Sequence, residues 1–298
     1  MQPTKAILAA VLVAAIMQCA MPQSAEAAEI KVISGGAFKT VLNDLVAQYQ
    51  KESGNTVAVT YRTVGQHMKL IASGEEKFDV AVLTPEAIDG LVKEGKVVPG
   101  SRADLAKTGV GVVVKAGTPL PDISTVEAFK KALLAAKSVA YIDPAAGGSS
   151  GIYVGKLLER LGIAKEVNAK AVLVHGGEVA THVVDGEAEV GIHQISEILA
   201  VKGAVLVGPL PAAIQNFTVY AAGVAAGDGA AAKSLVKFLA GPHAISIIKS
   251  KAWNRPARSG APRKGSARRG AGAGLSSWPS YAVSAGRAPM RHAECPSE

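Results

Sequence analysis

A loop rich in glycine and serine is the segment of this chain that is best suited to bind an anion. The stretch "YIDPAAGGSSGIYVGKLLERLG" (residues 141–162) reads as the end of a strand, a loop and a helix. Ser149, Ser150 and Gly151 stand where the helix begins, so their backbone N–H groups and hydroxyls are available to an anion. A nucleotide-binding P-loop is excluded, because the Gly155–Lys156 pair is followed by leucine instead of Ser or Thr. We predict that the loop binds a free anion or a carboxylate; a purely structural loop is the alternative.

Other motifs with catalytic chemistry are missing from the sequence. It contains no HExxH, no cysteine cluster and no Asp-rich calcium loop. The only two cysteines are Cys19 and Cys295, so the residues between them offer no thiol nucleophile and no disulfide. These absences favour binding over catalysis and leave proton transfer open. We expect no metal and no cofactor.

Strand and helix patterns alternate along residues 29–251 and identify the elements that must position the loop. Apolar side chains from Phe38 to Tyr49 recur at 3.6-residue spacing and predict a helix that Gly54 ends. Strands are expected at 29–36, 56–64, 78–84, 109–117, 138–143, 169–175, 189–195, 205–210 and 216–224, with helices between most of them and two helices at the end. This order predicts an α/β protein with two lobes, each a mainly parallel sheet flanked by helices, and a cleft between them.

The two ends of the chain differ from this core. Residues 1–27 combine a basic start, an apolar run over residues 6–16 and Ala25-Glu26-Ala27, which predicts a cleaved signal peptide and a periplasmic protein. Residues 252–298 have no periodicity and predict a disordered tail. The tail holds eight Lys+Arg and two Asp+Glu, so it carries most of the chain's formal net charge of +8. We therefore expect no nucleic-acid partner, and we expect a monomer.

Five strings within residues 29–251 resemble the molybdate-binding branch of the type II periplasmic solute-binding proteins, which are receptors of ATP-driven (ABC) importers. The strings are "VISGGAF", "LIASGEEKFDVAVLT", "YIDPAAGGSSGIYVGKLLERLG", "GEVATHVVDGEAEVGI" and "FLAGPHAISIIK". The resemblance implies a type II periplasmic binding fold, a small anionic ligand and a membrane permease as partner. It also implies lobe boundaries: residues 28–109 with 219–251 form the first lobe, and 110–218 form the second.

The resemblance also implies which residues line the binding site. In this branch, hydroxyls, backbone N–H groups and a tyrosine hold an oxyanion, and the matching positions come from five segments. They are Ser34, Gly35, Gly36 and Ala37; Arg62, Gly65 and Gln66; Ser149, Ser150 and Gly151; Val179; and His193 and Gln194. Gln194 stands in place of the tyrosine, and the first segment has lost or displaced a hydroxyl.

These departures suggest a ligand larger than molybdate, such as a carboxylate that Arg62 grips through two hydrogen bonds. A surface role for Arg62 is the alternative. A periplasmic aconitate isomerase is similar to molybdate-binding proteins, so an isomerase of a tricarboxylate on the same scaffold is the alternative function. In that case His193 or His67 would be the catalytic base. A regulatory ligand sensor is a third interpretation.

The tail admits a second explanation. Similar proteins often end in a Gly-Met-Glu-Pro-like segment, and the codons GGC ATG GAA CCG with one G removed read Ala-Trp-Asn-Arg. Residues 252–255 are Ala-Trp-Asn-Arg. We hypothesise that residues 252–298 are a frameshift product; an ordinary disordered basic tail is the alternative.

Overall fold

The structure, a computed structural model, describes residues 27–227, 229–251 and 253, which all fall in one compact unit within residues 1–257. Apart from Ala27 and Trp253, the predicted signal peptide and the predicted tail lie outside the described residues. No helix among the described residues has the length and apolar character needed to cross a membrane.

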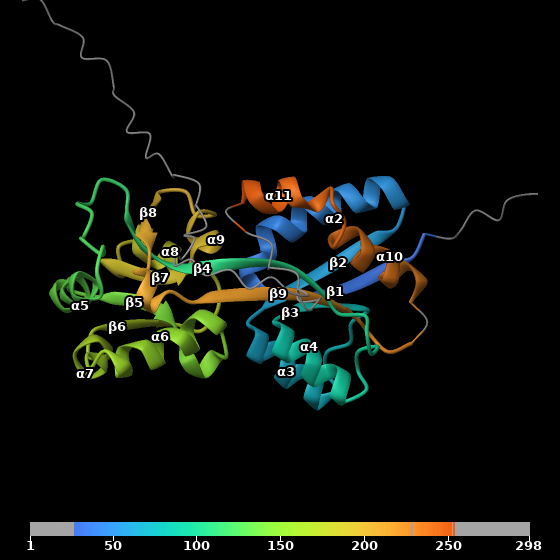
Figure 1. The fold of residues 1–298 in the computed structure, drawn as a ribbon, viewed down its shortest axis with the longest axis horizontal. Coiled ribbons are helices and arrows are strands. Elements are labelled where there is room, and N and C mark those ends of the chain that lie inside the picture. The colour runs from blue at the N-terminus through green and yellow to red at the C-terminus, as the bar shows by residue number, and fades with distance from the viewer. Residues whose placement is uncertain (1–26, 228, 252, 254–298) are drawn as a thin grey trace, which may run out of the picture. The chain divides into compact units, whose positions relative to one another are not determined.

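Nine strands and ten α-helices alternate along the described residues in the predicted order (Figure 1). The strands are β1 (Glu29–Gly35), β2 (Thr56–Arg62), β3 (Val80–Leu83), β4 (Ala103–Lys115), β5 (Val139–Ile142), β6 (Ala171–Val174), β7 (Val190–Gln194), β8 (Ala204–Pro209) and β9 (Phe217–Val224). The helices are α2 (Lys39–Ser53), α3 (Val64–Ser73), α4 (Pro85–Lys93), α5 (Val126–Ala135), α6 (Ser149–Arg160), α7 (Ala164–Asn168), α8 (Val179–Val184), α9 (Ile195–Ile198), α10 (Ala230–Leu239) and α11 (Ala244–Ser250). The 3-10 turns are η2 (Gly36–Phe38), η3 (Pro144–Ala146) and η4 (Ala212–Ile214).

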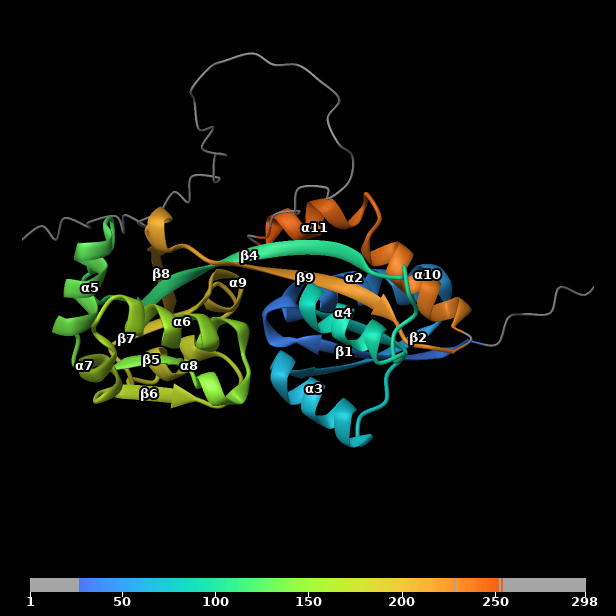
Figure 2. The ribbon, with the colours of Figure 1, turned by 60° about the horizontal axis from the view of Figure 1, so that its bottom comes forward.

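The sheet is mixed, and its parallel parts lie in two separate groups of strands. β1 lies between β2 and β3 and is parallel to both, and β5 lies between β6 and β7 and is parallel to both. Two long strands join these groups: β9 is antiparallel to β3 and β4, and β4 is antiparallel to β7 and β8. β4 pairs with β9 up to Gly109 and with β7 from Val110 onwards. β4 and β9 therefore run side by side from one lobe to the other (Figure 2).

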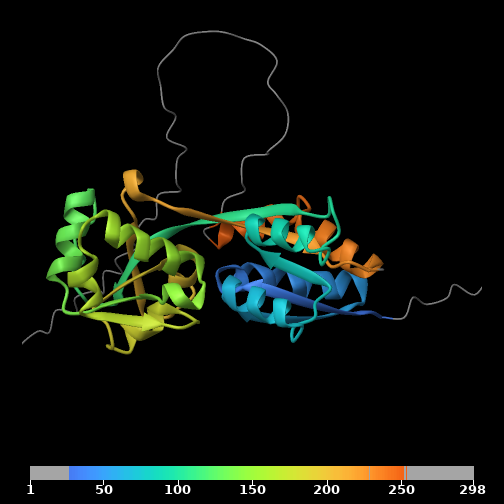
Figure 3. The ribbon, with the colours of Figure 1, turned by 90° about the horizontal axis from the view of Figure 1, so that it is seen from below.

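Helices cover both faces of the sheet in each lobe (Figures 1 and 3). In the first lobe, a core of buried residues lies between the sheet and α2, α10 and α11, and a second core lies under α3 and α4. In the second lobe, one core lies under α5, α6 and α7 and another under α8 and α9. This two-lobed α/β architecture is the predicted one, except that the strands joining the lobes add antiparallel pairs.

Trp253 differs from the expectation of a tail without core contacts. Its side chain is 1% exposed and packs edge-on against Phe38 and Tyr220, with ring centroids at 5.1 and 5.6 Å. Tyr220 lies on β9, and Phe38 lies at the end of η2. The aromatic cluster therefore anchors the chain after α11 in the core of the first lobe.

Candidate functional site

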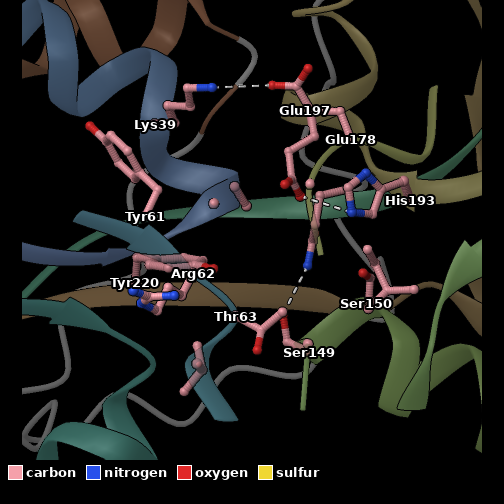
Figure 4. Close-up of a pocket in the computed structure, with 17 residues that line it drawn as sticks. Lys39, Tyr61, Arg62, Thr63, Ser149, Ser150, Glu178, His193, Glu197 and Tyr220 are labelled. Carbon is pink, nitrogen blue, oxygen red and sulfur yellow. Dashed lines mark hydrogen bonds and ion pairs between the residues drawn. The ribbon is translucent and has the colours of Figure 1, made fainter. Parts of the chain in front are cut away.

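A pocket of about 200 Å³ lies where strand ends and helix starts of both lobes meet (Figure 4). Its walls come from η2, the start of α2, the end of β2, the start of α6, the loop before α8, the end of β7, α9 and β9. The lining residues are Gly36, Ala37, Lys39, Tyr61, Arg62, Thr63, Val64, Ile142, Gly148, Ser149, Ser150, Gly177, Glu178, His193, Gln194, Glu197 and Tyr220. The described residues contain no group of three or more His, Cys, Asp or Glu side chains that could hold a metal ion.

Two helix starts face this pocket without a side-chain cap. Gly148 is the N-cap of α6 and Gly35 is the N-cap of η2, and neither start has a capping side-chain hydrogen bond. The first N–H groups of a helix have no partner within the helix, so an uncapped start presents donors and a partial positive charge. Gly151 lets the start of α6 pack closely against the end of β5, because a Cβ at this position would collide with the carbonyl oxygen of Ile142. The pocket is therefore suited to anions from two sides.

Ser149 anchors a polar network behind the start of α6. The Nε2 group of Gln194 lies 2.7 Å from Oγ1 of Thr218 and 3.2 Å from Oγ of Ser149. Oε1 of Gln194 is buried and has no partner among the described residues. Gln194, which stands where the resemblance implies a tyrosine, therefore fixes the Ser149 hydroxyl.

Arg62 lines the pocket and is held from behind by a buried carboxylate. Its Nε lies 3.6 Å from Oε1 of Glu76, while Oε2 of Glu76 lies 2.6 Å from Nδ1 of His67. Nε2 of His67 lies 3.0 Å from the carbonyl oxygen of Ser34. The Arg62 side chain is 46% exposed and lies in the pocket lining.

His67 differs from its predicted role as a catalytic base. Its side chain is fully buried, it does not line the pocket, and each of its ring nitrogens already faces an oxygen acceptor. A base must reach the proton that it removes. His67 instead joins α3 to the end of β1 and, through Glu76, helps to hold Arg62.

His193 and Glu197 form a second histidine–carboxyl pair, and this one reaches the pocket. Nε2 of His193 on β7 lies 3.2 Å from Oε2 of Glu197 on α9, and the two side chains are 2% and 12% exposed. Burial lowers the pKa of His193 to about 3, because desolvation disfavours the charged ring. Burial and the nearby Glu178 raise the pKa of Glu197 to about 8, against a smaller opposite effect of Lys39. Both members of the pair are therefore uncharged at neutral pH.

Contacts between the lobes surround the pocket. Nζ of Lys39 on α2 lies 3.6 Å from Oε1 of Glu178. The hydroxyl of Ser196 donates to the carbonyl of Ala37 at 3.1 Å, which brings α9 against η2. Burial raises the pKa of Tyr220, and the neighbouring Glu197 raises it further.

The structure brings seven of the predicted site residues together in the pocket lining. They are Gly36, Ala37, Arg62, Ser149, Ser150, His193 and Gln194. The other six lie behind or beside it. Ser34 is buried at the end of β1, Gly35 packs against Tyr220, and Gly151 packs against the end of β5. Val179 is in the core of the second lobe, and Gly65 and Gln66 line a neighbouring groove with Gly147 and His175.

Sequence reasoning missed five charged or aromatic residues of the lining. They are Lys39, Tyr61, Glu178, Glu197 and Tyr220. Only Glu197 had a usable signal, because it follows His193 by four residues at a strand end. The others reach the pocket from a helix, a loop and two strands.

The two-lobed fold, with the pocket between the lobes, is the architecture of the type II periplasmic binding proteins. The chain belongs to the family of bacterial extracellular solute-binding proteins, whose model matches residues 30–254.

Three relatives show the range of this family. An aconitate isomerase from Pseudomonas sp. is 32% identical over 253 residues, covering 83% of this chain and 94% of the isomerase. The molybdate-binding protein ModA of Azotobacter vinelandii is 29% identical over 260 residues, covering 82% of this chain and 95% of that protein. The solved structure of the periplasmic molybdate-binding protein of Azotobacter vinelandii superposes with a TM-score of 0.66 at 22% identity, covering 76% of this chain and all of that chain.

Proposed function

We propose that this protein is the periplasmic receptor of an ATP-driven importer and binds a small carboxylate-bearing anion in the pocket between its lobes. The observation that carries the proposal is the meeting of two uncapped helix starts with Arg62 around one pocket. Backbone N–H groups and helix dipoles stabilise an anion without a full counter-charge, and a guanidinium adds two parallel donors. Family membership supports the receptor role.

The cationic side chains and the size of the pocket favour a carboxylate over a tetrahedral oxyanion. Arg62 and Lys39 both reach the lining, whereas the resemblance implies neutral donors only. A volume of about 200 Å³ corresponds to about seven waters at about 30 Å³ each, so the pocket has room for more than the five non-hydrogen atoms of a molybdate ion. A ligand with two or more carboxylates would reach both Arg62 and the start of α6.

The remaining parts of the proposal concern location and motion. Residues 1–27 would direct export to the periplasm, and a membrane permease would receive the ligand-loaded protein. Residues 28–109 with 219–251 and residues 110–218 would act as the two lobes, with the paired strands β4 and β9 as the hinge. A monomer without a nucleic-acid partner fits this role.

One observation favours a second candidate, an isomerase of an unsaturated tricarboxylate. The His193–Glu197 pair places an exchangeable proton in the lining, and proton transfer requires such a group. Moving a double bond by one carbon removes a proton from the allylic carbon and adds a proton to the far carbon of the original double bond. A carboxyl group with a pKa of about 8 is matched to both steps at neutral pH. The 32% identity to an aconitate isomerase supports this candidate.

A ligand panel followed by a turnover assay separates the two functions. The panel is molybdate, tungstate, sulfate, phosphate, citrate, cis-aconitate and trans-aconitate, each added to the exported protein in a thermal-shift assay. An anion at 100 times its Kd stabilises the folded protein by about 2.7 kcal/mol. We expect citrate or an aconitate to raise Tm, and proton NMR then shows whether one aconitate isomer is converted into the other. Binding without conversion supports the receptor, and conversion supports the isomerase.

Two arginine variants make the assay specific for the pocket. Arg62→Gln should abolish the shift, because it removes the guanidinium from the lining. Arg160→Gln, an exposed arginine in the last turn of α6 and outside the lining, should retain it. A panel in which only molybdate or tungstate binds, or in which Arg62→Gln binds as well as the parent, would overturn the carboxylate assignment.

A further inference from the structure

The charges around the pocket do not favour an anion unless Glu197 is neutral. The two cations of the lining already face carboxylates, Lys39 at 3.6 Å from Glu178 and Arg62 at 3.6 Å from Glu76. Glu197 has no lysine or arginine within ion-pair distance among the described residues, and its partner is His193. With all three carboxylates ionised, the acids outnumber the cations, and the excess negative charge lies on the wall that an anion must touch.

The groups that face Glu197 come from four elements. His193 reaches it from β7, Lys39 from α2, Glu178 from the loop before α8, and Tyr220 from β9. Lys39 and Glu178 form a pair with each other, and burial keeps His193 and Tyr220 uncharged at neutral pH, because it lowers the pKa of His193 and raises that of Tyr220. Glu197 is therefore the group on this wall whose own charge can change near neutral pH.

The histidine holds Glu197 in a defined orientation. Nδ1 of His193 is buried and has no partner among the described residues. A buried N–H without a partner costs more than a bare acceptor nitrogen, so the ring proton resides on Nε2, which lies 3.2 Å from Oε2 of Glu197. The other oxygen, Oε1, is left on the side of Gly36, where an added Cβ would lie 3.1 Å from it.

We propose that Glu197 is a ligand-binding residue of this pocket that acts in its protonated form: it donates the proton on Oε1 to the bound anion, and His193 positions it. This inference rests on the proposed binding of an anion. Binding at a pH where Glu197 is ionised takes up one proton from solvent, and no other bond changes. The raised pKa of Glu197 agrees with the charge argument. An anion with a strong acceptor oxygen at this wall is the favoured ligand, and the pocket loses affinity as the solution becomes basic.

The test measures the pH dependence of Kd for the tightest anion of the panel by isothermal titration calorimetry. For the parent protein, a group that titrates near pH 8 should weaken binding about tenfold between pH 7 and pH 9, with uptake of up to one proton. Glu197→Gln keeps a donor of the same shape, so it should bind with a Kd that is constant over this range. Glu178→Gln is the matched control: it should retain the dependence, with a midpoint at lower pH because one repelling charge is removed.

The outcomes separate this inference from the proposed function. Binding that is independent of pH in the parent protein, or a dependence that persists in Glu197→Gln, overturns the inference and leaves anion binding in place. Absence of binding by every anion at every pH overturns the proposed function. In that case a ¹³C NMR titration of the ligand-free protein, with Glu197→Gln to assign the resonance, still decides the proton's location: titration near neutral or basic pH supports the inference, and titration in the ordinary acidic range refutes it.

Discussion

Replacement of Trp253 tests whether the residue after α11 is part of the folded protein. The indole is 1% exposed and touches Phe38 and Tyr220 edge-on, so Trp253→Ala removes a large buried side chain from the first lobe. Truncation of a buried tryptophan costs about 3 to 5 kcal/mol. Its Nε1–H has no partner among the described residues, and removal of a buried unpaired donor returns about 1 kcal/mol or more. We expect a net loss of about 2 to 4 kcal/mol.

The loss should be visible as a fall in Tm. A domain of this size shifts by about 2 to 4 °C per kcal/mol, so Trp253→Ala should melt roughly 4 to 16 °C below the parent protein. Trp253→Phe retains an aromatic ring and removes the unpaired N–H, so it should stay within about 1 kcal/mol of the parent. Trp278→Ala, at the other tryptophan and outside the described residues, is the control. A change below about 1 kcal/mol for Trp253→Ala would refute the packing argument and support a tail that begins at residue 252.

Three further predictions concern residues at or near the pocket. Glu197→Gln should be more stable than the parent protein at pH 8. The folded-state pKa of Glu197, about 8, lies above the ordinary value of 4.5, so the free energy of unfolding of the parent is highest below about pH 4.5 and falls by up to about 5 kcal/mol as the pH rises to 8. Urea unfolding at several pH values would measure this fall. Glu76→Ala should lower the free energy of unfolding by about 3 kcal/mol, because it leaves the buried His67 without its acceptor, whereas an effect below 1 kcal/mol would contradict this pairing. Gly65→Ala should weaken ligand binding measured by calorimetry, because its Cβ would lie 2.7 Å from Cα of Gly147 and would push the two lobes apart at this point. Unchanged affinity would argue against this contact.

Much of the fold was predictable because its signals are local. The spacing of apolar residues from Phe38 to Tyr49 predicted α2, and Gly54 ends that helix in the left-handed conformation with φ 74°. Thr63 and Gln66 form a capping box that begins α3. Hydrogen bonds of this kind join residues a few positions apart, so the sequence order reveals them. The antiparallel pairing of β4 with β9 joins residues more than 100 positions apart, and the sequence contains no comparable signal for it.

The residues of the candidate site were likewise predictable only where their signals are local. Ser149, Ser150 and Arg62 were recognisable because their residue types, at a helix start and a strand end, suit an anion. The roles of the two histidines were not. His67 and His193 were both plausible catalytic bases by their positions in the sequence. In the structure, both ring nitrogens of His67 face oxygen atoms behind the pocket, whereas His193 lies against Glu197 in the pocket lining.

The sequence by itself determined the order of strands and helices, the family and the loop that begins α6, since each depends on neighbouring residues or on a string of them. Only the tertiary structure decided that Glu197 is uncharged at neutral pH, that Glu76 holds Arg62 and that Trp253 belongs to the core. Burial and charge depend on which atoms surround a side chain in space, and those atoms come from elements far apart in the chain. A carboxyl group becomes a proton donor only when the packing of α9, β7 and η2 removes it from water.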